Sequence, residues 1–565
     1  MLLKKIIPSV ICLFSINLVT AQLNFNWVKQ LGGLGTEVGT NLTTDNFGNI
    51  YTVGWFEGTV DFDPGVGVFN LSSSGDKDVF ISKLNSDGNF VWAKKIGGTS
   101  YDYSKSIFVD LSGNIFIAGN FKGSANFDPG NTNITLTSSG IDDIFISKFD
   151  SLGNHKWTKK IGGLYGDIGQ KITGDKNGNI YCTGYFTGTV DFDPGATVYN
   201  LNYIAGNDIF ILKLNTNGDF VWVKQQGGNS IDQGLDITID NSGYIYTTGV
   251  FQSTADFDPG ASIYNLTSVG GSDVFISKLD STGSFVWARK IGGTSTDLAN
   301  SISIDVSNNI YITGYFWGTS DFDPSNTVYN LTSSGLSDIF ISKFDSAGNY
   351  LWAKKMGGTS YDQALSVIND SIGHVFTTGY FNGTCDFDPS SDTLNLISIG
   401  ASDSFISCLD SLGNSVWTKS YGSTFNDVGY GLSSKISGSL YSCGGFQGTI
   451  DFDFSSNVFN LTSIDSVDTY IFKLSDIAIG LNEKHQSQTI SFFPNPAQNQ
   501  LNFDIKPSDN FNIELFNNLG QLLINEEINS VKKIIDIHSL ANGIYFIKII
   551  NNSGKTSSIK FIKNN

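Results

Sequence analysis

Tryptophan recurs at a constant interval along most of this chain, and the interval constrains the fold more than any other feature. Seven of the nine Trp residues follow one another every 65 residues, at Trp27, Trp92, Trp157, Trp222, Trp287, Trp352 and Trp417. The phenylalanine of a Phe-Asp motif keeps the same step from Phe62 to Phe452. A fixed period without net insertion indicates repeated units that each pack on the next.

One repeat contains four runs of residues that predict short strands. The runs alternate apolar and polar residues or are rich in β-branched and aromatic ones, and Gly, Asn and Ser separate them. In the second repeat they cover residues 90–95, 106–110, 115–121 and 143–149. Four antiparallel strands per unit are typical of a propeller blade. The sequence therefore predicts an all-β chain whose main part is a seven-bladed β-propeller, with an additional hairpin around residues 126–130 of this repeat.

The order of the strands predicts how the ring closes. The first expected strand is a Trp strand over residues 25–31, and the last is residues 468–473. One period after Trp417 the chain has Asn482, so the last blade lacks an outer strand. We expect the first strand to supply it, because this pairing leaves no open sheet edge.

The repeated Trp residues have two interpretations. Each ring fills the space between neighbouring blades, or each ring stacks on a sugar at the surface. We favour the first, because a buried Trp contributes mostly through packing.

The charge of the chain excludes one class of partner. The 565 residues carry a formal net charge of -19, and the propeller repeats hold Arg289, the single Arg of the chain. Such a surface repels phosphate backbones, so nucleic acid is not an expected partner. The acidity is typical of a soluble protein or of one that binds cations, and we favour solubility.

The first 21 residues have the pattern of a signal peptide. Lys4 and Lys5 precede a mostly apolar segment, and Val19-Thr20-Ala21 fits the small-residue cleavage rule. No later stretch approaches the roughly 20 apolar residues of a spanning helix. We expect an exported protein without a transmembrane segment after cleavage.

The repeats resemble the secreted bacterial β-propeller repeat (SBBP) family. The resemblance is carried by residues 48–56 (Gly-Asn-Ile-Tyr-Thr-Val-Gly-Trp-Phe), by 78–84 (Asp-Val-Phe-Ile-Ser-Lys-Leu) and by Gly88-Asn89 before Trp92. It covers about residues 24–476. It implies a propeller used outside the cell, and it implies no particular activity. We place the propeller domain at 22–478.

After a polar linker over residues 479–487, residues 488–565 form alternating runs with Gly and Asn turns, as in a small β-sandwich. This segment resembles the type A C-terminal sorting domain of the type IX secretion system of Bacteroidetes-like bacteria. The resemblance implies recognition by the secretion machinery and delivery to the cell surface or the extracellular space. The positions on the family pattern are Pro494, Asn495, Pro496, Gly520, Gly543 and Lys560. The same Pro and Gly residues also suit turns.

A repeated Asp-Phe-Asp motif, in most copies followed by Pro, is the candidate metal site. In extended chain the two Asp side chains share one side, and together with carbonyl oxygens they suit Ca²⁺. The alternative, which we favour, is a turn in which Asp accepts backbone N–H groups. The candidates are Asp61, Asp63, Asp191, Asp193, Asp256, Asp258, Asp321, Asp323, Asp386, Asp388, Asp451 and Asp453, and the second copy has Asn126 and Asp128. No other cofactor is expected.

Nothing else in the sequence predicts catalysis. The four His residues do not recur with the repeat, and no blade carries an insertion for a catalytic loop. Cys385 and Cys408 share one repeat and could pair, although each replaces an ordinary residue of the other repeats. We expect a binding, adhesion or scaffold module with a glycan or protein ligand. The alternatives are an extracellular polysaccharide hydrolase or lyase and a purely structural surface protein.

Overall fold

The computed structural model describes residues 24–128, 132–434, 438–475, 491–493, 497–504, 511–517, 522–529, 533–551 and 556–563. All regular structure in these residues is β-strand. The chain divides into two compact units, one covering Thr20–Ala478 and one containing Ile479–Asn565. The expected signal peptide (1–21) and linker (479–487) lie outside the described residues.

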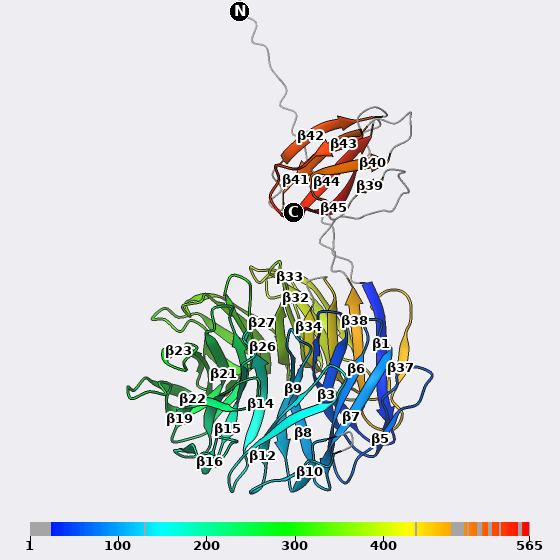
Figure 1. Ribbon diagram of the computed structural model, residues 1–565. Helices are drawn as coiled ribbons and strands as arrows, with labels where there is room; N and C mark the ends of the chain where they lie inside the picture. The colour runs from blue at the N-terminus through cyan, green and yellow to red at the C-terminus, as the bar shows by residue number, and fades with distance from the viewer. Residues whose placement is uncertain are drawn as a thin grey trace, which may run out of the picture. The chain divides into compact units, whose positions relative to one another are not determined.

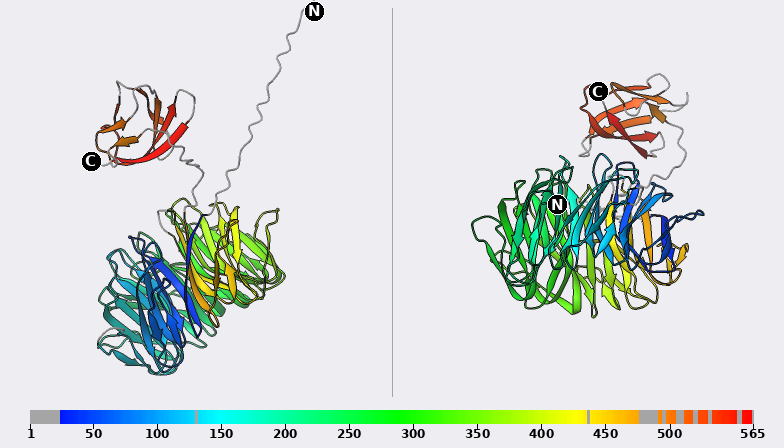
Figure 2. Two further views of the ribbon diagram at one scale, coloured as in Figure 1. Left: turned by 90° about the vertical axis from the view of Figure 1, so that its right-hand side faces the viewer. Right: turned by 60° about the horizontal axis from the view of Figure 1, so that its bottom comes forward.

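Strand pairing divides the larger unit into seven antiparallel blades of four strands, several of which the hairpins join into wider sheets. The blades are drawn in Figures 1 and 2. The first four, in chain order and from the inner to the outer strand, are β2 (Glu37–Thr44), β3 (Ile50–Phe56), β6 (Asp78–Leu84) and β7 (Phe90–Gly98); β8 (Asp102–Val109), β9 (Ile115–Phe121), β12 (Asp143–Phe149) and β13 (His155–Ile161); β14 (Ile168–Gly174), β15 (Ile180–Phe186), β18 (Asp208–Leu214) and β19 (Phe220–Gly228); and β20 (Asp232–Ile239), β21 (Ile245–Asp256), β22 (Asn265–Leu279) and β23 (Phe285–Gly293). The other three are β24 (Asp297–Ile304), β25 (Ile310–Asp321), β26 (Asn330–Phe344) and β27 (Tyr350–Gly358); β28 (Gln363–Asn369), β29 (Val375–Phe381), β32 (Asp403–Leu409) and β33 (Ser415–Tyr421); and β34 (Val428–Ser434), β35 (Leu440–Phe446), β38 (Asp468–Ser475) and β1 (Asn24–Gly33).

The inner strands form a closed ring. Each of β2, β8, β14, β20, β24, β28 and β34 contacts the inner strand of the next sheet, and β34 contacts β2 in turn. This arrangement of blades around a central channel confirms the propeller that the repeats predict.

The first strand closes the ring, as predicted. β1 pairs antiparallel with β38, from Asn24 opposite Ser475 to Leu31 opposite Thr469. In the left view of Figure 2 the blue strands of the first blade accordingly lie beside the yellow and orange strands of the last. The last blade thereby gains its fourth strand from the opposite end of the propeller sequence.

A short hairpin follows the second strand of every blade, as expected from the extra length of the repeat. Five are separate strand pairs, β4 (Thr59–Asp61) with β5 (Asn70–Ser72), β10 (Ser124–Asn126) with β11 (Thr135–Thr137), β16 (Thr189–Asp191) with β17 (Asn200–Asn202), β30 (Thr384–Asp386) with β31 (Asn395–Ile397), and β36 (Thr449–Asp451) with β37 (Asn460–Thr462). In the fourth and fifth blades the hairpin extends β21–β22 and β25–β26. We call the face that bears them the hairpin face; β5, β10 and β16 mark it at the bottom of Figure 1.

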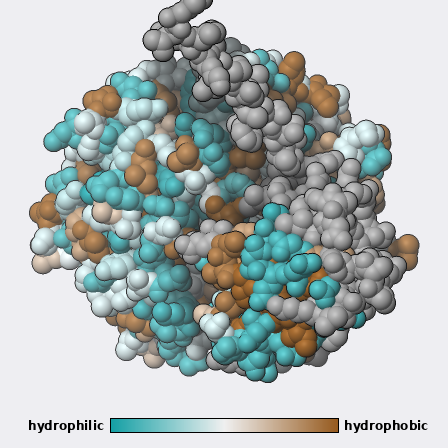
Figure 3. All heavy atoms as spheres, turned by 90° about the horizontal axis from the view of Figure 1, so that it is seen from above, coloured by the Kyte–Doolittle hydropathy of each residue, from teal (hydrophilic) through white to brown (hydrophobic). Residues whose placement is uncertain are grey.

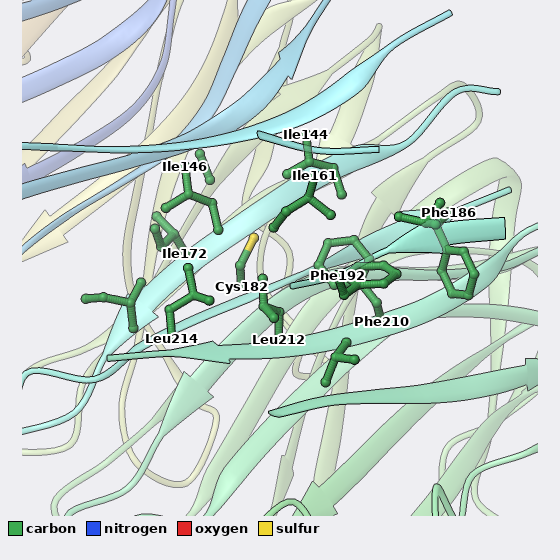
Figure 4. Packing of buried hydrophobic residues seen from close by; sticks show 14 of the residues in the cluster. Ile144, Ile146, Ile161, Ile172, Cys182, Phe186, Phe192, Phe210, Leu212 and Leu214 are labelled. Atoms are coloured by element: carbon green, nitrogen blue, oxygen red, sulfur yellow. The ribbon is translucent and has the colours of Figure 1, made fainter. Parts of the chain in front are cut away.

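Each hydrophobic core lies between two blades. Figure 4 shows the cluster between the second and third blades, where Ile144 and Ile146 of β12 face Cys182 of β15 and Leu212 of β18. All four side chains are buried. Burial of this kind contributes roughly 25 cal/mol per Å² of apolar surface, and neither blade supplies it alone.

The inner strands begin earlier than the sequence predicts. In the second blade the expected strand covers residues 106–110, whereas β8 begins at Asp102. The difference arises at Lys105, where a β-bulge shifts the register between Ser104 and Ser106. Because side chains alternate with a period of two, one extra residue puts the preceding residues out of phase with the rest of the strand.

The smaller unit contains two sheets. One is β39 (Ser491–Phe493), β40 (Gln500–Asp504) and β43 (Ile534–Asp536), and the other is β42 (Leu522–Ile528), β41 (Phe511–Phe516), β44 (Gly543–Asn551) and β45 (Thr556–Lys563). Its buried core includes Leu501, Ile513, Leu515 and Ile547.

Candidate binding site in the central channel

The β-bulge of β8 recurs in every inner strand, at the same position of the repeat. The seven bulged residues are Thr40, Lys105, Gln170, Leu235, Asn300, Leu365 and Tyr430. A bulge turns its extra residue away from the regular ladder. All seven residues line one cavity of about 640 Å³ at the centre of the ring, which we call the channel pocket.

A glycine in the facing strand makes room for each bulge. In the second blade Gly119 of β9 lies opposite Ser104, and a methyl group on it would overlap the carbonyl oxygen of Tyr103. Glycine occupies this position in all seven repeats, at Gly54, Gly119, Gly184, Gly249, Gly314, Gly379 and Gly444. The backbone of the site is therefore constant, whereas its side chains comprise six residue types in seven copies.

The channel pocket opens on the hairpin face. Tyr101 and Tyr103, at the start of β8, line it, and so does Asn120 at the end of β9, immediately before the β10–β11 hairpin. The chain enters and leaves the propeller at the other face, where Asn24 pairs with Ser475. On the surface seen in Figure 3, hydrophobic side chains stand as scattered patches among hydrophilic ones, as is usual for a protein surface.

One side of the channel pocket is polar. Thr40, Lys105 and Gln170 come from three consecutive blades. The Lys105 Nζ makes no hydrogen bond or ion pair with the residues that the structure describes, and burial lowers the pKa of Lys105. Lys171, the next residue after the Gln170 bulge, lies 3.7 Å from the carboxylate of Asp236.

The other side is largely apolar. Leu235, Leu365 and Tyr430 line it, and burial raises the pKa of Tyr430. Asn300 lies among them, but its amide Nδ2 donates a hydrogen bond of 2.8 Å to the carbonyl oxygen of Ala364 in the next blade. The amide of Asn300 thus links two inner strands.

Three aromatic residues form one corner of the mouth. Trp55 and Tyr103 meet edge to face with their ring centroids 5.9 Å apart, and the rings of Tyr101 and Tyr103 are 5.6 Å apart. The Lys77 Nζ lies 4.1 Å from the centre of the Trp55 ring, and the Lys122 Nζ lies 4.9 Å from that of Tyr101.

Asp142 is the one carboxylate among the described residues that line the channel pocket. It accepts hydrogen bonds of 3.4 Å from the Tyr101 hydroxyl and from the Asn120 amide. Burial raises the pKa of Asp142. The nearby Asp236 lies deeper, where it accepts hydrogen bonds from Ser301 and from two backbone N–H groups. The pocket thus offers hydrogen-bonding groups, aromatic rings and one unpaired ammonium group.

The repeated Asp pairs lie in the hairpins, away from the channel. Asp61 Oδ1 accepts the N–H groups of Asp63 at 3.0 Å and Phe69 at 2.8 Å, and Asp63 accepts that of Gly65. The same bonds occur in the other five Asp-Phe-Asp copies. In the second copy the neutral Asn126 accepts the N–H of Asp128 in the same way. This geometry suits the turn interpretation, and the calcium interpretation stays a prediction. The described residues contain no group of three or more His, Cys, Asp or Glu side chains placed to hold a metal.

Grooves beside these hairpins repeat from blade to blade. Asp321 and Asp323 line one of about 590 Å³, and Asp386 and Asp388, one repeat later, line another of about 330 Å³. Equivalent residues form both grooves, so the grooves follow from the repeated architecture.

The repeated Trp residues lie between blades. The Trp92 ring of the first blade packs against Gly153 in the β12–β13 turn of the second, and its Nε1 donates to the Ser151 carbonyl oxygen at 3.4 Å. Trp157 and Trp352 make the equivalent hydrogen bond. These contacts agree with the interpretation in which each Trp ring fills the space between neighbouring blades.

Among the described residues, none of the remaining predicted residues lines the channel pocket. Gly543 begins β44, and Lys560 lies in β45 opposite Phe546. Pro494, Asn495, Pro496 and Gly520 are outside the described residues. Cys385 and Cys408 are both free. Each is buried in a different hydrophobic cluster, so the disulfide that the sequence left open does not form.

Sequence reasoning missed the seven bulged residues. Their signal is present in the aligned copies, where the residue before each bulge is always Gly, Ala or Ser and the bulged residue changes.

A set of buried carboxyl pairs at the blade junctions was also missed. Each pair joins the first residue of an inner strand, or the residue next to it, to an Asp of the third strand in the preceding blade. That Asp is the first residue of its strand except in the longer β22 and β26. The pairs are Glu37 with Asp468, Asp102 with Asp78, Asp167 with Asp143, Asp232 with Asp208, Asp297 with Asp273, Asp362 with Asp338, and Asp427 with Asp403. Burial raises the pKa of all fourteen groups.

Two relatives each match more than half of this chain. An uncharacterized WD repeat-containing protein, L264 of Acanthamoeba polyphaga mimivirus, is 28% identical over 468 residues, which cover 69% of this chain and 34% of the relative. The regulatory protein FlaEY of Caulobacter vibrioides is 24% identical over 399 residues, which cover 59% and 42%. The chain therefore spans less than half the length of either relative. A crystal structure of a protein of unknown function from Dyadobacter fermentans is 11% identical, covers 64% of this chain and 95% of that one, and has a TM-score of 0.31.

Two families match the chain at the positions that the fold leads one to expect. Residues 26–55, 91–124, 156–188 and 221–250 match the β-propeller repeat family SBBP. Residues 491–564 match the secretion system C-terminal sorting domain, which directs export to the cell surface or the extracellular space. Among the described residues, none forms a helix of the length and apolarity needed to cross a bilayer. This chain is therefore a secreted β-propeller protein of SBBP repeats with a type IX secretion sorting domain.

Proposed function

We propose that this exported protein is a binding module whose ligand enters the channel pocket. The observation that carries the proposal is the contrast between a constant frame and variable side chains. Every blade has the same bulge and the same facing glycine, yet the bulged residues are Thr, Lys, Gln, Leu, Asn, Leu and Tyr. A purely structural ring does not need this diversity, whereas a site that recognises an asymmetric ligand needs different side chains around it.

The size and chemistry of the channel pocket support a small ligand or the end of a larger one. Small-molecule sites typically occupy about 300–1,000 Å³ and combine apolar or aromatic walls with a few polar groups. The cavity of about 640 Å³ combines Trp55, Tyr103 and two Leu residues with Lys105 and Gln170. A glycan or a protein segment outside the cell is the ligand class that suits export of this chain.

The arrangement supports binding rather than the alternative of polysaccharide hydrolysis. Glycoside hydrolases generally use two carboxyl groups on either side of the bond that they cleave. Asp142 is the single carboxylate lining the channel pocket in the described part of the chain. Asp236 is engaged by Lys171, Ser301 and the backbone.

An array of glycans and extracellular proteins, probed with the labelled full chain, tests the proposal. The wild type is compared with Leu365→Arg, which places a long charged side chain in the channel pocket. Leu412→Arg is the matched control, because Leu412 is an exposed turn residue of the same blade. We expect at least one ligand that the wild type and Leu412→Arg retain and that Leu365→Arg loses.

Two other results would contradict the proposal. If all three proteins bind the same ligands equally, recognition takes place outside the channel. If none of them binds anything on the array, the interpretation as a purely structural surface protein is favoured. Chemical analysis of the glycans after incubation tests the enzyme alternative, because a hydrolase or lyase would leave shortened products.

A further inference from the structure

We infer that the channel pocket recognises an acidic sugar, with the carboxylate of one uronic acid residue placed on Lys105. This inference rests on the proposed function and names the ligand class of the same site. It is carried by the charge of Lys105, by the division of the pocket into a polar and an apolar side, and by the aromatic corner of its mouth.

Lys105 is the one lysine of the pocket wall that has no carboxylate partner among the described residues. It lines the cavity, and it has no hydrogen-bond or ion-pair partner in the described part of the chain. Lys105 is half-buried. An ammonium group that is partly shielded from water and has no partner is costly, and an anion bound beside it offsets that cost. The lowered pKa of Lys105 has burial as its cause, which agrees with a position shielded from water.

The other charged groups at the pocket already have partners. Lys171 lies beside Asp236, and Asp142 accepts hydrogen bonds from Tyr101 and Asn120. Lys77 at the mouth pairs with Glu57 at 3.4 Å and lies over the Trp55 ring. Lys105 is therefore the one ammonium group of the wall left to pair with a ligand, so we expect the ligand to carry one carboxylate at this depth.

The surroundings of Lys105 suit a sugar ring. A pyranose has hydroxyl groups at its edge and a face of C–H groups, and it needs polar partners on one side and apolar ones on another. Gln170 of the next blade has no hydrogen-bond partner in the described residues and lies on the same polar side as Lys105. Leu235, Leu365 and Tyr430 supply the apolar side.

The mouth extends this surface toward solvent. Tyr103 contacts both Trp55 and Tyr101, and each of the three residues is partly exposed. Lys77 and Lys122 cover ring faces of this cluster and lie on flexible stems, which can move aside for a second sugar. A sugar chain would thus run from Lys105 outward past the aromatic corner.

A peptide with several acidic residues suits the site less well. The chain carries a net charge of -19, which repels a polyanion. A mostly neutral oligosaccharide that carries one uronic acid satisfies Lys105 without that repulsion. An acidic peptide is therefore the competing ligand class, and the titration below includes one.

Calorimetric titration of the full chain with matched disaccharides tests the inference. Cellobiouronic acid carries one carboxylate where cellobiose carries a hydroxymethyl group, and acetyl-Glu-Gly-amide presents the same charge on a peptide. We expect the wild type to bind cellobiouronic acid at least about tenfold more tightly than cellobiose or the peptide, because a hydrogen bond to a charged group contributes on this scale.

Variants of Lys105 separate recognition from folding. Lys105→Met removes the charge and is expected to bind both disaccharides to within about threefold of each other, with an unchanged melting temperature. Lys105→Arg keeps the charge and is expected to keep the preference. Lys176→Met is the matched control, because Lys176 lies on a turn at the face opposite the mouth and should bind as the wild type does.

The possible failures are distinguishable. Equal affinity for the two disaccharides, or a preference that survives Lys105→Met, overturns the acidic-sugar inference and leaves the proposed channel function standing. Tighter binding of the peptide also overturns it in favour of a peptide ligand. If no probe binds, the inference is wrong, and the array comparison of Leu365→Arg with Leu412→Arg decides whether the channel binds any ligand.

Discussion

Glu37 and Asp468 lie beside each other in the junction that closes the propeller, although they belong to opposite ends of its sequence. Both carboxyl groups are fully buried. Gln30 of the closing strand donates a hydrogen bond to Asp468, and Gly33 N–H donates one to Glu37 at 3.0 Å. Burial, followed by the charge of Asp468, raises the pKa of Glu37, so this pair retains a proton at neutral pH.

The junction pairs predict that the propeller loses stability as the pH rises. Burial raises the pKa of Asp102, Asp167 and Asp232 to about 7, well above the roughly 3.9 of Asp in an unfolded chain. The folded state binds more protons between these values, so the stabilisation is complete below the unfolded pKa and is lost as the pH rises through about 7. We expect the melting temperature to fall by at least about 5 °C from pH 5 to pH 8.

Two variants test whether the junction pairs cause the dependence of the melting temperature on pH. Asp102→Asn removes one of the titrating groups and should flatten the dependence between pH 5 and pH 8. Asp87→Asn, in an exposed turn, should leave it unchanged. A melting temperature that rises over this range in the wild type would show that these groups are ionised in the folded protein.

The pairing of β1 with β38 predicts that the N-terminal strand holds the ring together. Deleting residues 22–32 removes the outer strand of the last blade and exposes the edge of β38. We expect a sharp fall of the melting temperature. The milder variant Leu31→Ala leaves the strand in place but empties a fully buried position and should cost about 2–5 kcal/mol of unfolding free energy. Unchanged melting in both variants would refute closure by this strand.

The glycines that face the bulges predict one position in every blade at which a larger side chain lowers the stability. A methyl group at Gly119 would overlap the Tyr103 carbonyl oxygen. Gly119→Ala should therefore push the two strands apart and lower the unfolding free energy by about 1–3 kcal/mol. In Gly166→Ala, the control, the new methyl group meets its nearest neighbour at an ordinary 3.9 Å. Denaturant unfolding of the two variants compares them directly. Equal stability would show that the bulge does not depend on this glycine.

Substitution of a hairpin carboxylate distinguishes a role in the turn from a role in calcium binding. Asp256 accepts the N–H groups of Asp258 and Tyr264 at 3.0 and 2.8 Å. If the turn is its role, Asp256→Asn should melt close to the wild type, because the amide oxygen accepts the same bonds, whereas Asp256→Ala should be less stable by about 1 kcal/mol. Calcium and excess EGTA should then give the same melting curve. A large calcium-dependent rise that Asp256→Asn reduces would establish a metal site instead.

Much of the fold follows from the sequence because its signals are local and repeated. The spacing of Trp27 to Trp417 predicts the blades, and the missing eighth Trp predicts closure by the first strand. The bulges could not be read from alternation, because the extra residue at Lys105 inverts the pattern before it. For the same reason β8 begins four residues before the predicted strand.

The channel pocket was not predicted, because its residues come from seven repeats and converge only in the closed ring. Lys105, Gln170 and Leu365 each stand alone in the sequence, and nothing within one repeat marks them. The Asp-Phe-Asp motif, by contrast, is conspicuous because it recurs, and the structure gives it the hydrogen bonds of a turn. In a propeller whose repeats are as regular as these, the positions that differ between copies indicate the binding site better than the positions that recur.

The stoichiometry of ligand binding tests the central claim most directly. Isothermal titration of the full chain with a ligand identified on the array should give one site per chain, because the seven bulged residues line a single cavity. Leu365→Arg should abolish that site, while Leu412→Arg should keep it. Several equivalent sites per chain, or one site that Leu365→Arg leaves intact, would place recognition in the repeated grooves beside the hairpins and contradict the account.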